Sequence, residues 1–190
     1  GRLAFASLIF LALFQLSEYL ICAGRNELFW YLIGWLSITL LPPLGLHLVS
    51  VVTGRNLFYR YFYFAGFVFM GIMIFYDGLL VSAYCAGNYV IFTSISPFLE
   101  ELYKFYYYLG LILVVVGSVW PKGRGLLELE KKLLCYVVIG YLSFMVPTAI
   151  IIQLPSFGLH SLPSVLCGFA VIFAFILTFF IVPTGRKLDK

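Results

Sequence analysis

The chain has 190 residues, of which 63% are apolar and only 11% are charged, and its mean hydropathy is +1.06. Soluble domains carry about 25% charged residues, so this composition excludes an ordinary soluble domain and indicates a polytopic membrane protein. The formal net charge of +4 does not indicate nucleic-acid binding, because the basic residues lie in short loops between apolar runs. Membrane lipid is therefore the expected surrounding, and no nucleic acid is expected as a partner.

Six apolar runs are each long enough to cross a bilayer, whose hydrocarbon is about 30 Å thick and needs about 20 helical residues. They predict an all-α bundle of six transmembrane helices, which forms a single membrane domain over residues 1–190. The expected helices cover residues 3–23, 29–53, 57–84, 98–120, 133–154 and 162–183. The first run is too long for the apolar part of a cleavable signal peptide, so we expect it to stay in the membrane.

The basic residues predict the orientation, because cytoplasmic loops are rich in Lys and Arg. One set of loops and ends holds all of the 12 basic residues except Arg25 and Lys104. This asymmetry predicts a multi-pass cell-membrane protein, such as one of a bacterial inner membrane, with both termini in the cytoplasm. Residues 85–96 then lie outside. They are apolar, too short to span and rich in β-formers, which predicts a short external hairpin or lid, or else a loop lying along the lipid.

Ionisable and polar side chains inside the apolar runs gather near the predicted outer face. Burying a charge in hydrocarbon costs about 2.5–3.5 kcal/mol on insertion scales, so such residues usually line a cavity or pair with one another. In the first helix, the spacing of three or four residues predicts one shared face for Gln15, Glu18, Tyr19 and Cys22. The candidate ligand-binding residues are Gln15, Glu18, Tyr19, Asp77, Glu100, Glu101, Tyr103, Lys104, Tyr107 and Gln153.

Each part of this candidate site has a plainer alternative. Glu100 and Glu101 suit the positive end of a helix dipole, and Glu100 has the spacing of an ion pair with Lys104. Glu18 and Asp77 do not lie at a helix start, which favours the bundle interior, although both could reach the interface. Inside the bundle, Lys104 could neutralise one of the two acids, and the other could bind a proton or a cation. The tyrosines could instead form an interfacial aromatic belt.

Prolines predict kinks, and therefore hinges, at Pro42 and Pro43 in the second helix and at Pro147 in the fifth. A proline has no backbone N–H, so it frees a carbonyl one turn earlier. His47 could satisfy such a carbonyl or carry a proton.

The cysteines and the absent motifs bear on other chemistry. Cys22 and Cys85 both map near the external face, which allows a disulfide between them, whereas Cys135 maps near the inner face. The sequence has no CxxC or HExxH motif, no nucleotide-binding glycine motif and no nucleophile elbow. We therefore expect no metal, no cofactor and no enzymatic activity.

One stretch of the chain, residues 3–55, follows a recognisable order. It contains Glu18 near a helix end, Trp30, Trp35, the run LLPPLGLH at 40–47 and the exit VTGR at 52–55. This order resembles the N-terminal seven-helix membrane sensor region of bacterial histidine kinases. The resemblance implies a signal-receiving role. It also implies one more helix upstream of Gly1 and either a kinase or cyclase module after Lys190 or a stand-alone bundle that signals through a cytoplasmic partner.

These observations favour an integral membrane sensory or ligand-binding bundle, which receives an external small molecule, ion or proton at an outer-leaflet polar pocket. The proline kinks would relay helix movement inward. A small transporter or channel would need a continuous polar path, and the inner halves of the helices offer few polar residues. A scaffold subunit, bound through its acids and Lys104 to other membrane protein subunits, is the remaining alternative.

Overall fold

The structure is a computed structural model, and it describes residues 1–24, 28–75, 80–85, 90–94, 96–120, 125–152 and 171–188. For residues 80–85, 90–94, 151, 152 and 188 it describes the backbone alone. The helices are α1 (Arg2–Cys22), α2 (Leu28–Thr53), α3 (Tyr59–Phe75), α4 (Pro97–Val119), α5 (Glu128–Ile152), the π-helical turn η2 (Leu177–Ile181) and α7 (Val182–Leu188). The two strands are β1 (Leu80–Cys85) and β2 (Val90–Ser94).

Four of the described helices, α1, α2, α4 and α5, are long and apolar enough to cross a membrane. Helix α3 is apolar but shorter, with 17 residues. Large apolar side chains are exposed on these helices, as at Phe64 and Ile112. Contiguous exposed apolar surface is typical of a face that meets lipid. The expectation of a helical membrane bundle is therefore confirmed at the level of four apolar helices.

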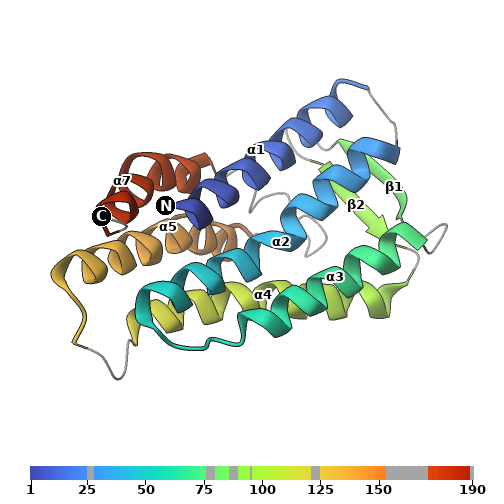
Figure 1. Ribbon diagram of the computed structural model, residues 1–190. Coiled ribbons are helices and arrows are strands. Elements are labelled where there is room, and N and C mark those ends of the chain that lie inside the picture. The colour runs from blue at the N-terminus through green and yellow to red at the C-terminus, as the bar shows by residue number, and fades with distance from the viewer. Residues whose placement is uncertain are drawn as a thin grey trace.

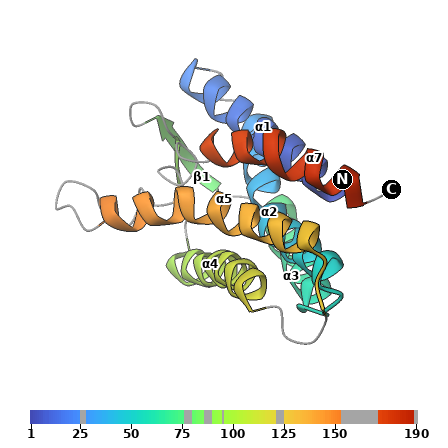
Figure 2. The same ribbon diagram turned by 90° about the vertical axis from the view of Figure 1, so that its left-hand side faces the viewer.

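The five long helices lie roughly along one direction, and α2 is at the centre of the bundle (Figure 1). It contacts α1, α3, α4 and α5, while η2 packs against α1 and α5 (Figure 2). Small residues allow this close packing. Gly45 of α2 faces the Tyr141 hydroxyl of α5, and Gly110 of α4 faces Pro42 of α2. A single core cluster of buried apolar and aromatic side chains runs between these helices.

Three of the expected helices, 3–23, 29–53 and 98–120, match α1, α2 and α4 to within one residue at each end. The fifth helix begins earlier than expected, at Glu128, because the charged residues before the apolar run are also helical. Lys131 pairs with Glu128 there, with Nζ and Oε1 2.6 Å apart. The last expected helix, 162–183, lies partly outside the described residues, and the helix continues past its expected end to Leu188.

The expected helix 57–84 is wrong in its second half. Helix α3 ends at Phe75, and Leu80–Cys85 is a strand that pairs antiparallel with Val90–Ser94. Hydropathy alone does not separate an apolar strand from an apolar helix, and residues 80–85 include β-formers such as Val81 and Tyr84. The expected hairpin therefore exists, but it begins before residue 85.

The bundle has two ends that differ in structure and charge. The hairpin end is the one where β1 and β2 lie, together with the end of α1 and the starts of α2 and α4 (Figure 1). The basic end is the opposite one, with the start of α1, the end of α2, the starts of α3 and α5, and α7.

Candidate functional site

The hairpin contacts both of the helices that carry most of the candidate residues, α1 and α4. Strand β1 contacts α1, and strand β2 contacts both α1 and α4 (Figure 1). Ser96 follows β2 closely and caps α4, because its Oγ accepts a hydrogen bond from the Leu99 N–H at 3.4 Å. Pro97, with no N–H to leave unpaired, occupies the first helical position. The chain therefore enters α4 from the hairpin in a fixed direction.

Glu18 is a buried carboxyl group near this end. It is 6% exposed in the outer half of α1, and its Oε2 accepts a hydrogen bond from Gln15 Nε2 at 3.2 Å. Tyr19, one residue further along, is 69% exposed and points away from the bundle. The helix face that the sequence predicted as one group is therefore divided: Gln15 and Glu18 turn inward, and Tyr19 does not.

Cys22 lies one helical turn beyond Glu18 and is disulfide-bonded. Cys135 is free and lies in α5, far along the chain from the hairpin. The predicted partner, Cys85, ends β1, whose side chains lie outside the described part of the chain. Because β1 contacts α1, the backbone arrangement suits the predicted pairing. The bond ties the end of α1 to another segment beside the Glu18 site.

Lys104 is neutralised within its own helix. Its Nζ lies 2.8 Å from Glu100 Oε1 and 2.9 Å from Glu101 Oε1, and its side chain is 17% exposed. The spacing-based prediction of the Glu100 pair is confirmed. The alternative that Lys104 neutralises Glu18 is not what the structure has, because both of its ion-pair partners belong to α4. Asp77 and Gln153 lie outside the described residues.

Tyr103 and Tyr107 belong to the core rather than to the wall of an open site. Both are buried and belong to the core cluster of the bundle. The Tyr103 ring lies 4.2 Å from the Trp35 ring, centroid to centroid, and its hydroxyl is 3.1 Å from Thr39 Oγ1. The sequence prediction missed Trp35 and Thr39, which connect α2 to α4 just below the hairpin end.

The proline segment of α2 has a hydrogen-bond partner on α4. Pro43 has no N–H to donate to the Thr39 carbonyl, four residues earlier. The Tyr106 hydroxyl donates to that carbonyl at 2.8 Å and lies 3.4 Å from the Phe62 carbonyl. His47 does not take this role: its Nδ1 is 3.4 Å from the Tyr63 hydroxyl.

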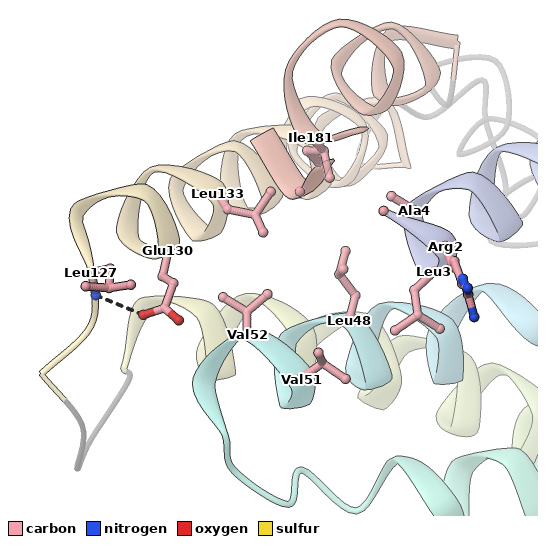
Figure 3. Close-up of a pocket in the computed structure, with 12 residues that line it drawn as sticks. Arg2, Leu3, Ala4, Leu48, Val51, Val52, Leu127, Glu130, Leu133 and Ile181 are labelled. Carbon is pink, nitrogen blue, oxygen red and sulfur yellow. Dashed lines mark hydrogen bonds between the residues drawn. The ribbon is translucent and has the colours of Figure 1, made fainter. Parts of the chain in front are cut away.

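The basic end contains a cavity of about 650 Å³ that is lined by α1, α2, α5, η2 and α7 (Figure 3). Its walls are mainly apolar, with Arg2 and Glu130 as the charged lining residues. Glu130 Oε2 also accepts a hydrogen bond from the Leu127 N–H at 2.8 Å. The lining residues are Gly1, Arg2, Leu3, Ala4, Leu48, Val51, Val52, Leu127, Glu130, Leu133, Ile181 and Gly185. No local sequence pattern could reveal it, because its walls come from segments far apart in the chain.

Known proteins offer no relative from which a role could be transferred. No family model, curated protein or solved structure matches this chain. The chemistry of the site therefore rests on its own residues. Over the described ranges, no three His, Cys, Asp or Glu side chains lie together as a metal site would require. The hairpin end offers a buried carboxyl group and amide at Glu18 and Gln15, which suits a proton, a cation or a small polar molecule.

Proposed function

We propose that the chain is a membrane-embedded receptor bundle that binds an external small molecule, ion or proton at its hairpin end. Helix α3 and the segment that ends in α7 would also cross the membrane, giving six spans with both termini in the cytoplasm. The observation that carries the proposal is the burial of Glu18 in α1, a helix that contacts the hairpin, together with the contact of the same hairpin with α4.

Burying the Glu18 carboxyl group costs free energy, and a site that uses this group would explain why it is there. Ionisable residues within membrane helices are rare, and they mark ligand sites or proton and ion pathways. Gln15 supplies one hydrogen bond, so the group is held in place at one carboxyl oxygen. The disulfide at Cys22 constrains the end of the same helix. A carboxyl group held by a neighbouring amide, in a helix whose end is constrained by a disulfide, is preorganised for binding.

Transport through the bundle has less support than one-sided reception. Towards the basic end, Leu46, Val49, Leu111 and Val114 are all almost completely buried. The buried hydroxyls of Thr53 and Ser118 donate to carbonyls of their own helices, so they do not line a polar path. A transporter or channel needs polar groups along its path. A binding site reached only from the hairpin end fits this arrangement of buried side chains better than a path through the bundle does.

A relay to the basic end would pass through α2. This helix touches both the Trp35–Tyr103 contact near the hairpin end and, through Leu48, Val51 and Val52, the cavity at the basic end. Shifts of about 1–2 Å between helices are a common form of switching, and they need space into which side chains can move. The cavity supplies that space. A cytoplasmic signalling partner, as in the kinase sensor regions that residues 3–55 resemble, would then read the movement.

The test compares Glu18→Gln, Asp77→Asn and the double variant with the native chain in lipid nanodiscs. Tm is measured across acidic to neutral pH and with Na⁺, K⁺ or Ca²⁺ added. A ligand at 100 times its Kd stabilises by about 2.7 kcal/mol, which corresponds to a Tm rise of roughly 5–10 °C for a chain of this size. We expect such a response in the native chain and its loss in Glu18→Gln, because glutamine keeps the shape but not the titrating group.

The control is Glu128→Gln, which removes one exposed carboxylate at the basic end. It should keep the full response. Unchanged responses in both the Glu18 and Asp77 variants would rule out the receptor site. Co-purification of a stoichiometric membrane partner that is lost in those variants would favour the scaffold alternative instead.

A further inference from the structure

The connection between α2 and α3 forms a basic groove at the basic end of the bundle. The groove has a volume of about 370 Å³. It is lined by Ser50, Val51, Gly54, Arg55, Asn56, Tyr59 and Arg60. These residues supply two guanidinium groups, an amide and hydroxyl groups, and none of them is a carboxylate. The groove is therefore chemically suited to an anion.

The groove has a defined shape because side-chain oxygens accept hydrogen bonds from its backbone. The Leu57 N–H donates to Ser50 Oγ at 3.2 Å, and the Phe58 N–H donates to Asn56 Oδ1 at 3.2 Å. Gly54 and Phe58 both have left-handed backbones, with φ of 65° and 57°. Phe58 is a bulky residue in a region that such residues rarely adopt, so the surrounding contacts must hold it there.

The two arginines keep most of their donors available. Arg55 Nη1 donates to the Trp120 carbonyl at the end of α4, at 2.9 Å, which orients the guanidinium. A guanidinium has five N–H donors, so this bond leaves four. The Arg60 guanidinium lies 5.9 Å from the centre of the Tyr59 ring. Both arginines are exposed, and both line the groove.

We propose that this groove binds the phosphate group of an anionic phospholipid. The guanidinium fork matches phosphate geometry, and two forks with no acid among the lining residues favour a negatively charged ligand. A lipid is favoured over a soluble phosphate because large apolar surface adjoins the groove. Val51, Phe58 and Tyr61 are all exposed there and would contact the acyl chains. The site is independent of ligand binding at the hairpin end, and the proposed orientation decides only which leaflet supplies the lipid.

The experiment uses the full chain in nanodiscs of phosphatidylcholine, with phosphatidylglycerol titrated in, and native mass spectrometry to count retained lipid. The double variant R55Q/R60Q is compared with R186Q/K187Q, which removes the same charge from exposed residues of α7. We expect R55Q/R60Q to weaken phosphatidylglycerol retention by about tenfold or more, because removing one charge-assisted hydrogen bond alone weakens binding by about that factor. R186Q/K187Q should retain the lipid almost as the native chain does.

Two further arms make the result decisive. Because R55Q also removes the bond to Trp120, R60Q is measured alone, and it should weaken retention without lowering Tm in pure phosphatidylcholine. Glycerol phosphate added to nanodiscs that contain phosphatidylglycerol should not displace the lipid at matching concentrations. An equal loss of phosphatidylglycerol retention in R186Q/K187Q would overturn the proposal and indicate diffuse charge attraction. Full displacement of the lipid by glycerol phosphate would overturn it and indicate a site for a soluble phosphate.

Discussion

Replacing Gly45 with alanine is expected to destabilise the bundle by about 1–3 kcal/mol, because overpacking a close contact forces neighbouring groups apart. A Cβ at this position would overlap the Tyr141 hydroxyl and lie 2.9 Å from Val114 Cγ2. Tyr141 has little freedom to move away, since it is buried and its ring packs at 4.9 Å from Phe173 and 5.6 Å from Phe144. The measurement is the free energy of unfolding in mixed detergent micelles.

Two variants separate this contact from a general effect of replacing glycine in a helix. Gly71 lies in α3 with nothing within 4 Å of an added Cβ, so Gly71→Ala should leave stability unchanged or raise it by up to about 1 kcal/mol. Tyr141→Phe removes the overlapping hydroxyl. Gly45→Ala should therefore cost clearly less in the Tyr141→Phe background, and an equal cost in both backgrounds would show that the Tyr141 hydroxyl is not the obstacle.

The sequence could predict where apolar helices lie but not which face of each one packs. Run length located α1, α2 and α4 to within one residue, because the hydrocarbon thickness sets the span. The inward face gives little signal, since lipid-facing and core-facing positions are both apolar. Tyr103 and Tyr107 were predicted to line a ligand site because they flank Glu100 and Lys104 in the sequence, and the pattern did not indicate that both side chains are buried in the core.

Local spacing predicted what lies within one helix, and it failed where distant segments meet. The Glu100–Lys104 pair follows from residues four apart on a helix and is present at 2.8 Å. The cavity at the basic end needs several helix ends in one place, and the groove with Arg55 and Arg60 needs a particular turn, neither of which a local pattern encodes. The end of α3 was missed because apolar residues lie on both sides of Asp77 and Gly78, and these two residues were placed inside one long helix although such a dipeptide is typical of a turn.

The proline segment of α2 shows both what local sequence can predict and what it cannot. Proline chemistry predicts that the Thr39 carbonyl lacks its helical donor, but it cannot say which group replaces that donor. In the structure the replacement comes from Tyr106, 67 residues further along the chain. An unsatisfied buried carbonyl is costly, so this hydroxyl should contribute strongly to the stability of the α2–α4 contact.

Removing that hydroxyl in Tyr106→Phe is expected to destabilise the bundle by about 1–3 kcal/mol, the usual cost of leaving a buried acceptor unsatisfied. The measurement is again the free energy of unfolding in mixed micelles. Tyr61→Phe is the matched control, because the Tyr61 side chain is exposed on the neighbouring helix α3 and should lose little. A loss in Tyr61→Phe as large as that in Tyr106→Phe would point to a general effect of the hydroxyl at the membrane.

A double-mutant cycle with Pro43 then tests the mechanism itself. Pro43→Ala restores an N–H that can donate to the Thr39 carbonyl, so that carbonyl no longer depends on Tyr106. Tyr106→Phe should therefore cost less in the Pro43→Ala background, with a coupling energy of about 0.5–3 kcal/mol, as is typical of residues that share one hydrogen-bond network. Strict additivity would mean that Tyr106 stabilises α4 against α2 by packing alone. A measured coupling would instead identify Tyr106 as the group that lets α2 keep Pro43 at the centre of the bundle.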